Sequence, residues 1–489
     1  MTVWRAVAFT RAGCPRTVGT GGGSNRWPAW HGRLAGAAFG LIAIAGTTAP
    51  AYAQPAPFQQ HFAEGATGFY QTIVGLFNTS RTEVAEVVVT LSPDSPGGTV
   101  EVPLTLDPFT RHTLNVNEAM GDRVGGVSIH VASDQPIAAT RQMQWGGAVT
   151  YGSTLESGVP ETATTWYFAE GATHVFNLFY LIANPNDAEA NVTIQYLRGS
   201  GGPVTEEEVL PAHSRRTIWA NAVPGLELAE VAAVISADQP IVAERAMYFG
   251  PLFDAAAASG GASALSPEWF FAEGETSFFD TFLLLGNPGD ATAEVSVTYQ
   301  LPDGSTLTKV HDLPAASRRT ILVDEEDSQL ASTAVAIRAS SSQPIIAERA
   351  MWWRGTAESW YEAHATLGAT ETGTVWAIGE GASGGPDAED TYVLVANATG
   401  DPGEVRVTVL DENGTTAQQG FALAGHQRLT LHLLQHFPGL EGQRFSVLVE
   451  SLVNGEPTGV PITVEYVRYQ STEGRFGNGG GAALATRVQ

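Results

Sequence analysis

The sequence predicts an all-β protein built from four tandem immunoglobulin-like β-sandwich repeats of about 105 residues each. Three observations lead to this fold class. Four short motifs recur four times, always in the same order. Each copy contains about seven short segments with the apolar and polar alternation of strands, bounded by Gly, Pro, Asn or Asp. No stretch holds a sustained helical period.

The four motifs define the repeat. The first, F-A-E-G, is followed by N-P-x-D, then S-R-R-T-I, then Q-P-I-V-A-E-R-A-M. The first motif lies at Phe62–Gly65, Phe168–Gly171, Phe271–Gly274 and, degraded, Ile378–Gly381, and the second at Asn184–Asp187 and Asn287–Asp290, with looser copies at Asn78 and Asn397. The third lies at 214–218 and 317–321, with looser copies at 110–114 and 427–431. The fourth lies at 239–247, 343–351 and 135–143, with a divergent copy at 460–468. A fixed order at a fixed spacing indicates tandem repeats of one structural unit.

The motif positions divide the chain into a leader and four domains. We expect a signal peptide at 1–53 and sandwich repeats at 54–160, 161–265, 266–370 and 371–489. The fourth repeat is divergent and ends in a Gly/Ala-rich tail, which resembles the connector after repeat 2. A propeller is the rival architecture, but its blades of about 40–50 residues would need a half-repeat that the sequence lacks.

Repeat 2 shows the predicted strands most clearly. Asn191–Tyr196 alternates between apolar and polar residues, and Leu178–Ala183 is continuously apolar up to an Asn-Pro turn. Further strands are expected near 166–169, 205–210, 214–219, 229–236 and 240–249. Between the third and fourth strands, Asp303-Gly304 and Asn413-Gly414 have the residues of a hairpin turn.

The leader has the features of an export signal. Residues 1–33 contain five Arg and no acidic residue, and the uncharged stretch Leu34–Gly46 follows. Its 13 residues suit a signal-peptide core and are fewer than the roughly 20 that span a bilayer. Ala51-Tyr52-Ala53 then matches the pattern that signal peptidase cleaves. We therefore expect export by the general secretory route, cleavage after Ala53 and no transmembrane segment afterwards; an uncleaved anchor is the alternative.

The charge of the chain restricts its partners. The formal net charge is −26, and loss of five leader Arg with no acid would make it −31. A general nucleic-acid binder needs a basic face, so nucleic acid is not an expected partner. Cys14 lies in the leader, which leaves no cysteine for disulfides or for a cysteine-rich metal site.

The ordered set W-x-F-A-E-G, N-P-x-D, S-R-x-T-I and Q-P-I-V-A-E-R resembles an uncharacterised repeat family of secreted and surface proteins of high-GC Gram-positive and related bacteria. The resemblance covers nearly all of 55–489. It implies an extracellular repeat module, and it brings no catalytic residue to this chain. The copies in repeats 1 and 4 depart furthest from the motifs.

One acid and one base recur in every copy. The acid is the Glu of F-A-E-G, and the base is an Arg late in the fourth motif. A charge inside an apolar strand needs a partner, because burying it alone is costly. We therefore predict structural ion pairs within each repeat, with a catalytic or metal-binding carboxylate as the alternative. The predicted pairs are Glu64 with Arg141, Glu170 with Arg245, Glu273 with Arg349, and Glu380 with Arg468.

Other chemistry-bearing patterns are weaker. Ser383 lies in a G-x-S-x-G pattern, but in a Gly-rich β context without the strand-to-helix turn of a nucleophile elbow. His432 and His436 have helical spacing without the Glu of a zinc protease. The acidic loops at 324–327 and 387–390 lack EF-hand spacing, and whether they bind calcium stays open. No catalytic residue, cofactor or metal ligand is predicted.

Aromatic residues offer a candidate binding surface. Trp352, Trp353, Trp360 and Tyr361 cluster at one edge of repeat 3. Exposed rings of this kind stack on sugars, so a glycan platform is one interpretation; packing in a core or joint is the other, since Trp buries a large area.

These observations together predict an elongated, secreted or surface-associated structural or adhesive repeat protein without catalytic activity. The alternative is an extracellular protein that binds carbohydrate or a cell-envelope polymer, and a secreted hydrolase is a third interpretation. The expected partners are cell-envelope polysaccharide or surface proteins. Free secretion and non-covalent attachment to the surface are equally open.

Overall fold

A computed structural model describes residues 57–489, apart from 95–97, 147–149, 200–201, 251–252, 254, 357–358 and 472–477. The predicted signal peptide at 1–53 and its cleavage site lie outside the described residues. Residues Gln54–Gln489 form one compact unit, and everything below concerns that unit. Strands are its dominant secondary structure and its helices are single short turns, so the predicted all-β class is confirmed.

Repeat 1 is a sandwich of two antiparallel sheets. One has the order β1-β7-β4-β5 with β2 on β7, and the other has the order β6-β3-β8-β9. The elements are β1 (Phe58–Phe62), β2 (Ala66–Thr67), β3 (Tyr70–Asn78), β4 (Ala85–Pro93), β5 (Val100–Leu106), β6 (Arg111–Asn115), α1 (Val116–Met120), β7 (Gly125–Ser133), β8 (Ile137–Gly146) and β9 (Thr150–Ser157).

Repeats 2 and 3 have the same plan, with one long strand running through both sheets of each sandwich. Repeat 2 contains β10 (Ala163–Phe168), β11 (Asn177–Asn184), β12 (Ala190–Arg198), β13 (Val204–Leu210), β14 (Ser214–Trp219), η1 (Ala220–Ala222), β15 (Val231–Phe249) and β16 (Ala255–Gly260). Repeat 3 contains β17 (Ser266–Phe271), β18 (Phe279–Asn287), β19 (Ala293–Gln300), β20 (Thr306–Leu313), β21 (Ser317–Leu322), α2 (Val323–Glu326), η2 (Ser328–Leu330), β22 (Ala336–Thr356) and β23 (Ser359–Leu367). The long strands are β15 and β22.

Repeat 4 again separates into two sheets, β27-β26-β29-β24-β32 and β28-β25-β30-β31. Its elements are β24 (Val375–Ser383), β25 (Glu389–Asn397), β26 (Gly403–Asp411), β27 (Thr416–Leu423), β28 (Arg428–His432), α3 (Leu433–His436), η3 (Pro438–Leu440), β29 (Gln443–Leu452), β30 (Ile462–Gln470), β31 (Gly479–Leu484) and β32 (Thr486–Arg487).

The expected strands of repeat 2 correspond to observed strands, with two differences. The segments near 229–236 and 240–249 join as the single strand β15. The Ala-rich segment Ala255–Gly260, which lies directly before the expected connector at 260–268 and in no expected strand, is a fully buried strand. A run of small residues resembles a linker in sequence, yet it is also what a strand needs when other strands approach closely.

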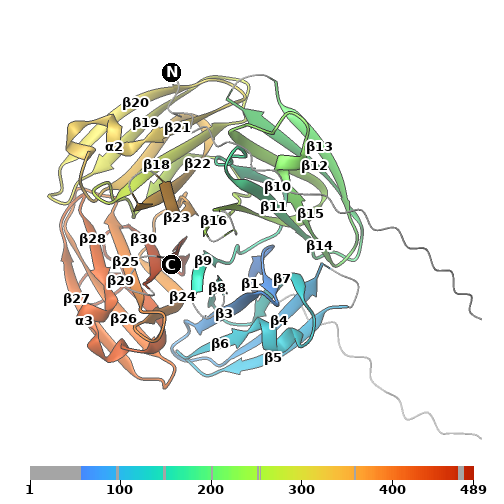
Figure 1. Ribbon diagram of the computed structural model, residues 1–489. Helices are drawn as coiled ribbons and strands as arrows, with labels where there is room; N and C mark the ends of the chain where they lie inside the picture. The colour runs from blue at the N-terminus through green and yellow to red at the C-terminus, as the bar shows by residue number, and fades with distance from the viewer. Residues whose placement is uncertain are drawn as a thin grey trace, which may run out of the picture. The chain divides into compact units, whose positions relative to one another are not determined.

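That close approach occurs at the centre of the compact unit. One strand from each repeat, namely β9, β16, β23 and β31, contacts the other three there. Figure 1 shows them at the hub, with the four sandwiches around them. A Cβ added to Gly481 of β31 would lie 2.5 Å from the backbone nitrogen of Leu155 in β9. Small side chains at the hub therefore allow the four strands to pack.

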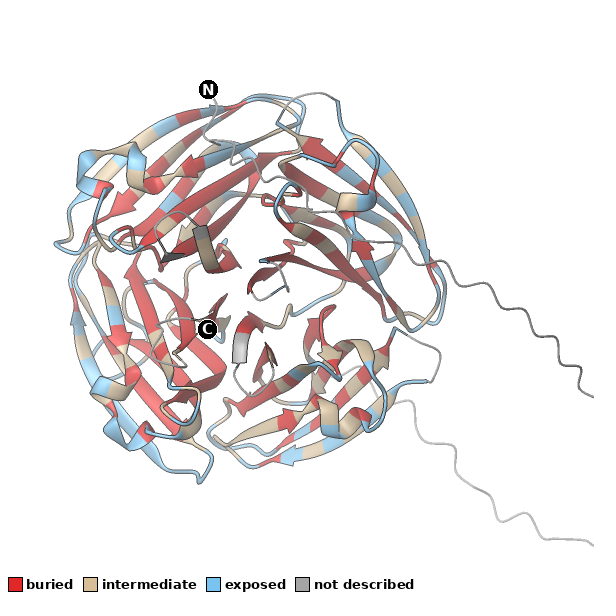
Figure 2. Cartoon of the chain, in the orientation of Figure 1, coloured by how far each residue is buried: buried red, intermediate tan, exposed pale blue. Residues whose placement is uncertain are grey.

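The four sandwiches close a ring, because repeat 4 contacts repeat 1 through β24 against β3 and β8. The expected elongated array is thus wrong. Each repeat is a complete two-sheet sandwich, so the ring also differs from a propeller of single-sheet blades. Figure 2 shows buried residues concentrated on the inner strands and exposed residues on the outer ones. The side of each repeat that faces the hub is therefore buried against the neighbouring repeats.

The second motif has a structural role in every repeat. Its Asn side chain is buried and donates through Nδ2 to carbonyls of the following loop and hairpin; for Asn184 the acceptors are Ala188 at 2.8 Å and Leu210 at 3.1 Å. Asn287, Asn78 and Asn397 make equivalent bonds. These bonds pair backbone carbonyls that no strand partner reaches.

Among the described residues, no helix has the length and apolarity required to cross a membrane.

Candidate functional site

The recurring charged residues meet where one repeat packs against the next. Within repeats 1, 2 and 3 the Glu of F-A-E-G contacts the Arg of the fourth motif. The separations are 3.0 Å for Glu64 and Arg141, 2.5 Å for Glu170 and Arg245, and 2.8 Å for Glu273 and Arg349. All six side chains are buried. These three contacts are the ion pairs expected from the sequence.

Each of these arginines also contacts a carboxylate from the following repeat. Arg141 lies 2.8 Å from Glu244, Arg245 lies 2.9 Å from Glu348, and Arg349 lies 2.9 Å from Glu465. The sequence analysis missed this second carboxylate. A signal was present, because Glu and Arg are adjacent in A-E-R and adjacent strand residues point to opposite faces. The Glu therefore faces the preceding repeat when the Arg faces the following one.

The same second carboxylate also binds the backbone of F-A-E-G. Glu244, Glu348 and Glu465 accept hydrogen bonds from the backbone nitrogens of Ala63, Ala169 and Ala272, at 2.7, 2.6 and 3.0 Å. The first Arg of the third motif binds nearby carbonyls: Arg215 donates to Ala63, Arg318 to Ala169 and Arg428 to Gly274. The third and fourth motifs of one repeat thus both contact the first motif of the preceding repeat, and the fourth also contacts the Arg paired with it.

Burial dominates the electrostatics of these junctions. It raises the pKa of Glu465 to about 7, although the nearby Arg349 acts to lower it. Burial also raises the pKa of Glu244 and Glu348 above the ordinary range, again against a neighbouring Arg. For Glu244, Glu348 and Glu465 the largest cause is desolvation, which disfavours the charged carboxylate and outweighs the attraction of the neighbouring Arg.

The fourth predicted pair, Glu380 with Arg468, does not form. Strand register explains the difference. Arg245 lies opposite Tyr180, four residues before the motif residue Asn184, whereas Val393, four residues before Asn397, lies opposite Tyr466. Tyr466 therefore occupies the Arg position in repeat 4, and Glu465 before it is the counterpart of Glu244. Arg468 lies two residues further along, where the other repeats have Met143, Met247 and Met351.

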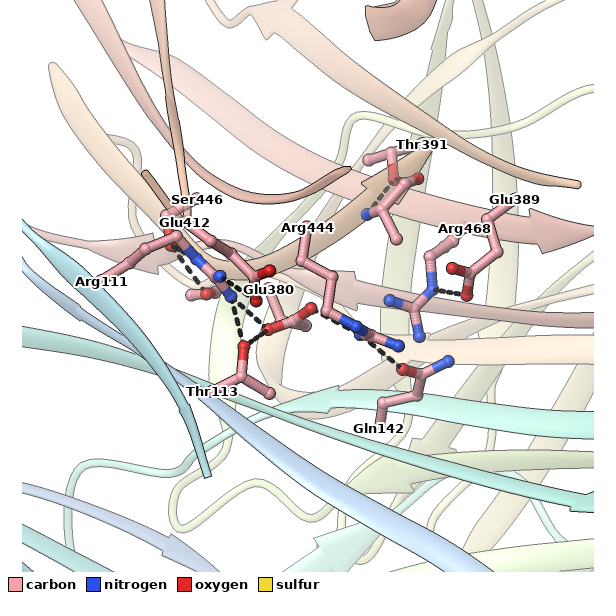
Figure 3. Close-up of polar contacts among 12 residues, drawn as sticks. Arg111, Thr113, Gln142, Glu380, Glu389, Thr391, Glu412, Arg444, Ser446 and Arg468 are labelled. Atoms are coloured by element: carbon pink, nitrogen blue, oxygen red, sulfur yellow. Dashed lines mark hydrogen bonds and ion pairs between the residues drawn. The ribbon is translucent and has the colours of Figure 1, made fainter. Parts of the chain in front are cut away.

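Glu380 is instead held at the closing junction by other residues. Its carboxylate contacts Arg111 of repeat 1 at 2.6 Å and Arg444 of repeat 4 at 2.7 Å, and it accepts from Thr113 at 3.1 Å (Figure 3). Arg111 also pairs with Glu412 at 3.1 Å. The first Arg of the third motif is thus again a junction residue, and here its guanidinium pairs with two carboxylates of repeat 4.

The closing junction is also more polar than the other three. In those, an aromatic residue of one repeat packs on an aromatic residue of the next. The ring centroids are 5.5 Å apart for Trp145 and Tyr248, 5.1 Å for Phe249 and Trp352, and 5.6 Å for Trp353 and Tyr469. At the closing junction the same two positions hold Gln470 and Gln144, and both amides donate to Glu389, at 3.3 and 3.4 Å.

The predicted glycan platform is not an exposed surface. Trp352 is 4% exposed and Trp353 is fully buried, because both belong to the junctions just described. Trp360 and Tyr361 are half-buried, and the Trp360 indole donates to Asp280 at 2.6 Å. The alternative interpretation, packing at a joint between repeats, describes Trp352 and Trp353. The aromatic area of Trp352 and Trp353 is thus covered by the neighbouring repeats and does not form a binding face.

The weaker sequence patterns fall in different places. Ser383 ends strand β24 with a buried hydroxyl, so the G-x-S-x-G pattern lies at a strand end and the turn into β25 rather than at a strand-to-helix turn. His432 pairs with Asp390 at 2.7 Å. Asp327 pairs with Lys309 at 2.9 Å. Within the described ranges no group of three or more His, Cys, Asp or Glu residues is arranged to hold a metal ion.

A pocket of about 280 Å³ lies at the junction between repeats 1 and 2. Its walls include four aromatic rings, from Tyr70, Phe179, Tyr248 and Phe253. Glu64, Asp94, Arg215 and Thr217 supply polar groups to the same pocket. Phe253 is 41% exposed, so one aromatic wall is open to solvent. No sequence motif marked this pocket, since its lining comes from two repeats and from a loop between strands.

The whole chain has only distant similarity to known proteins. No family model matches it, and no curated protein matches it. The crystal structure of Thermotoga maritima 1070 is 18% identical, covers 22% of this chain and 95% of that one, and has a TM-score of 0.20. A tetra-tandem repeat in the extending region of a large adhesion protein is 13% identical, covers 87% of this chain and 100% of that one, and has a TM-score of 0.11. At these scores neither likeness bears on fold or function.

Proposed function

We propose that this chain is a secreted or surface-associated structural or adhesive protein without catalytic activity. The observation that carries the proposal is the use of the recurring charged residues. Glu64, Arg141 and Glu244, with their equivalents in repeats 2 and 3, hold one repeat to the next. Residues repeated for assembly account for the motifs, and the product of that assembly is a rigid ring of β-sandwiches.

A binding experiment tests the adhesive part. Purified 54–489 is incubated with insoluble peptidoglycan, cellulose or chitin, and the protein left in solution is measured. We expect depletion by at least one polymer, while an unrelated protein of similar negative charge stays in solution. A chain that remains in solution with every polymer contradicts adhesion to envelope polysaccharide and favours a protein partner.

Export is tested separately. We propose the general secretory route with cleavage after Ala53, which is supported by the Arg-rich leader and the apolar stretch Leu34–Gly46. Mass spectrometry of the protein recovered from the medium or envelope should give a chain that begins at Gln54. A full-length chain in the envelope would favour the uncleaved anchor instead.

Carbohydrate binding is the second candidate function, and the pocket between repeats 1 and 2 favours it. Aromatic rings stack on the apolar face of a sugar, and carboxylate and guanidinium groups bind its hydroxyls. The rings of Phe179 and Phe253 with Asp94 and Arg215 provide this combination. We expect Phe253→Ala to weaken binding of a soluble polysaccharide about tenfold, which is about 1.4 kcal/mol.

The matched control is Phe278→Ala, since Phe278 is a similarly exposed ring, 48% against 41%, in repeat 3. Affinity electrophoresis of both variants gives the comparison. Equal retardation of wild type and both variants would exclude this pocket as the carbohydrate site.

A further inference from the structure

The closing junction contains a buried guanidinium without a hydrogen-bond partner. Arg468 is 3% exposed, and neither Nη1 nor Nη2 has a partner among the described residues. Its one ion pair there is long, 3.6 Å from Nε to Glu389. Glu389 is moreover shared with Gln144 and Gln470. A charge buried in this way is costly unless something pairs with it.

The surrounding groups are also donors without acceptors. Gln142 of repeat 1 is 1% exposed, and its Nε2 has no described partner. Its Oε1 accepts a weak bond from Arg444 at 3.5 Å. The Ser383 hydroxyl is buried and without a described partner as well. Figure 3 shows the side chains of Arg444, Arg468 and Gln142 close to one another across the junction.

Burial lowers the pKa of Arg468, and the nearby positive charge of Arg444 lowers it further. Two like charges so close to each other favour a negative charge between them. The carboxylate of Glu380 does not serve Arg468, because it is bound to Arg111 and Arg444. Repeat 1 supplies no carboxylate from the position that holds Glu244 in repeat 2, because that position is Thr140, whose hydroxyl bonds to Tyr466.

We propose that the closing junction binds a small carboxylate anion between Arg468, Arg444 and Gln142, bridging repeats 4 and 1. The planar fork of a guanidinium matches the two oxygens of a carboxylate. The ligand is the size of formate or acetate, because Arg468 and Gln142 on two of its sides are almost fully buried. It enters beside Arg444, whose side chain is 30% exposed.

Formate is the probe, and Arg468→Met is the decisive variant, since Met is the residue of the other three repeats at this position. The melting temperature of 54–489 is measured with increasing sodium formate. We expect the melting temperature of wild type to rise by about 1–2 °C when formate is in roughly tenfold excess over its dissociation constant. The melting temperature of Arg468→Met should not rise. Arg406→Met, which removes a partly exposed Arg paired with Glu450, should respond as wild type does.

Binding is also measured directly, from the line width of ¹³C-formate in solution with each protein. Wild type and Arg406→Met should broaden the signal, and Arg468→Met should not. Parallel responses of wild type and Arg468→Met in both measurements, or no response at all, would overturn the proposal and leave ordered water as the partner of Arg468. Full competition by an equal concentration of chloride would overturn the carboxylate class in favour of a halide.

Discussion

The hydroxyl of Tyr466 lies 2.8 Å from the hydroxyl of Thr140, across the junction that closes the ring. Tyr466 occupies the position of Arg141, Arg245 and Arg349, and Thr140 that of the carboxylate which those arginines contact. A neutral hydrogen bond thus replaces a buried ion pair at one junction of four. Both partners change together, so no charge is left unpaired at these two positions.

This exchange makes the closing junction specific. If repeat 4 packed on a repeat with Glu at the Thr140 position, Tyr466 would face a buried carboxylate without an Arg. If repeat 1 closed on a repeat with Arg, that Arg would lose its second carboxylate. A buried carboxylate without an Arg disfavours the first wrong pairing, and the loss of one of two carboxylate partners disfavours the second, so the neutral pair favours the correct closure.

A double-mutant cycle tests the equivalence of the two kinds of junction. Thr140→Glu alone buries a carboxylate opposite a phenol, and Tyr466→Arg alone buries a guanidinium opposite a hydroxyl. Each should lower the free energy of unfolding by about 3 kcal/mol. The double variant recreates an ion pair and should lose at least about 1 kcal/mol less than the sum, measured by guanidinium denaturation. Additive losses would contradict the positional equivalence of Tyr466 and Arg245.

Removing one central arginine should be far more costly than removing an exposed one. Arg245→Met leaves Glu170 and Glu348 buried with no cation between them, and we expect a loss of about 3–5 kcal/mol. Arg216→Met is the control, because the Arg216 side chain is 56% exposed in its pair with Glu208 and its loss should cost less than about 0.5 kcal/mol. Similar denaturation midpoints for the two variants would show that the buried triad does not stabilise the ring.

The fold class and the strands could be predicted from sequence because they depend on local patterns. Alternation along Asn191–Tyr196 and the turn after Ala183 report on neighbouring residues only. Ring closure could not be predicted, because it depends on the close packing of Gly379 in repeat 4 against Gly75 in repeat 1. These two residues lie some 300 positions apart along the chain. The small residues of β16 and β31 gave no signal either, because composition alone does not separate a buried strand from a linker.

Only part of the charged cluster at each junction could be predicted from the sequence. A recurring Glu and a recurring Arg predicted the pair of Glu170 and Arg245, because a buried charge needs a partner within reach. The partner from the next repeat was missed, although strand alternation places Glu244 and Arg245 on opposite faces. The error at Arg468 has a similar origin. Arg468 and Tyr466 are two residues apart, so their side chains lie on the same face of the strand. Only the spacing from the motif proline shows which of them is the counterpart of Arg245. Tyr466 follows Pro461 by five residues, as Arg245 follows Pro240.

Restoring the repeat consensus at Gly75 should destabilise the ring. The equivalent residue in repeat 2 is Leu181, which faces Glu244 in the strand pair as Gly75 faces Thr140. A Cβ at Gly75 would lie 2.4 Å from the Glu380 carboxylate and 2.6 Å from the Gly379 carbonyl. We expect Gly75→Leu to cost about 1–3 kcal/mol through overpacking.

The control for Gly75→Leu is Gly98→Ala, at a loop glycine where an added Cβ meets nothing within 4 Å, although its positive φ adds some strain. Gly98→Ala should lower the thermal midpoint much less. A Gly75→Leu chain that melts at or above the wild-type temperature would show that repeat 4 does not pack on β3 as closely as described.

The buried carboxyl group of Glu156 makes the stability of the ring depend on pH. Its side chain is buried in β9 and accepts backbone hydrogen bonds from Ser157 at 3.1 Å and Gly260 at 2.9 Å. Burial raises its pKa to about 8, with a further contribution from the nearby Glu244. Below that pH the folded chain holds a proton that an unfolded Glu, with a pKa of about 4.3, has already lost.

The sign of the pH effect follows from this difference. Between about pH 4.5 and pH 8 the folded state binds more protons at Glu156 than the unfolded state does, so this group makes stability fall as pH rises, by about 1.4 kcal/mol per pH unit where the difference is one proton. His61 acts in the opposite direction below about pH 6.5, because burial and the nearby His130 lower its pKa to about 3.

The pH dependence of Glu156 is therefore tested by comparing variants at the same pH, where the effect of His61 cancels. We expect Glu156→Gln to gain stability relative to wild type from pH 5.5 to pH 8, measured as the denaturation midpoint, and the exposed Glu161→Gln to keep the wild-type dependence. Parallel pH profiles for wild type and Glu156→Gln would mean that Glu156 is ionised in the folded ring, and that the hub holds its charge through Arg141 instead.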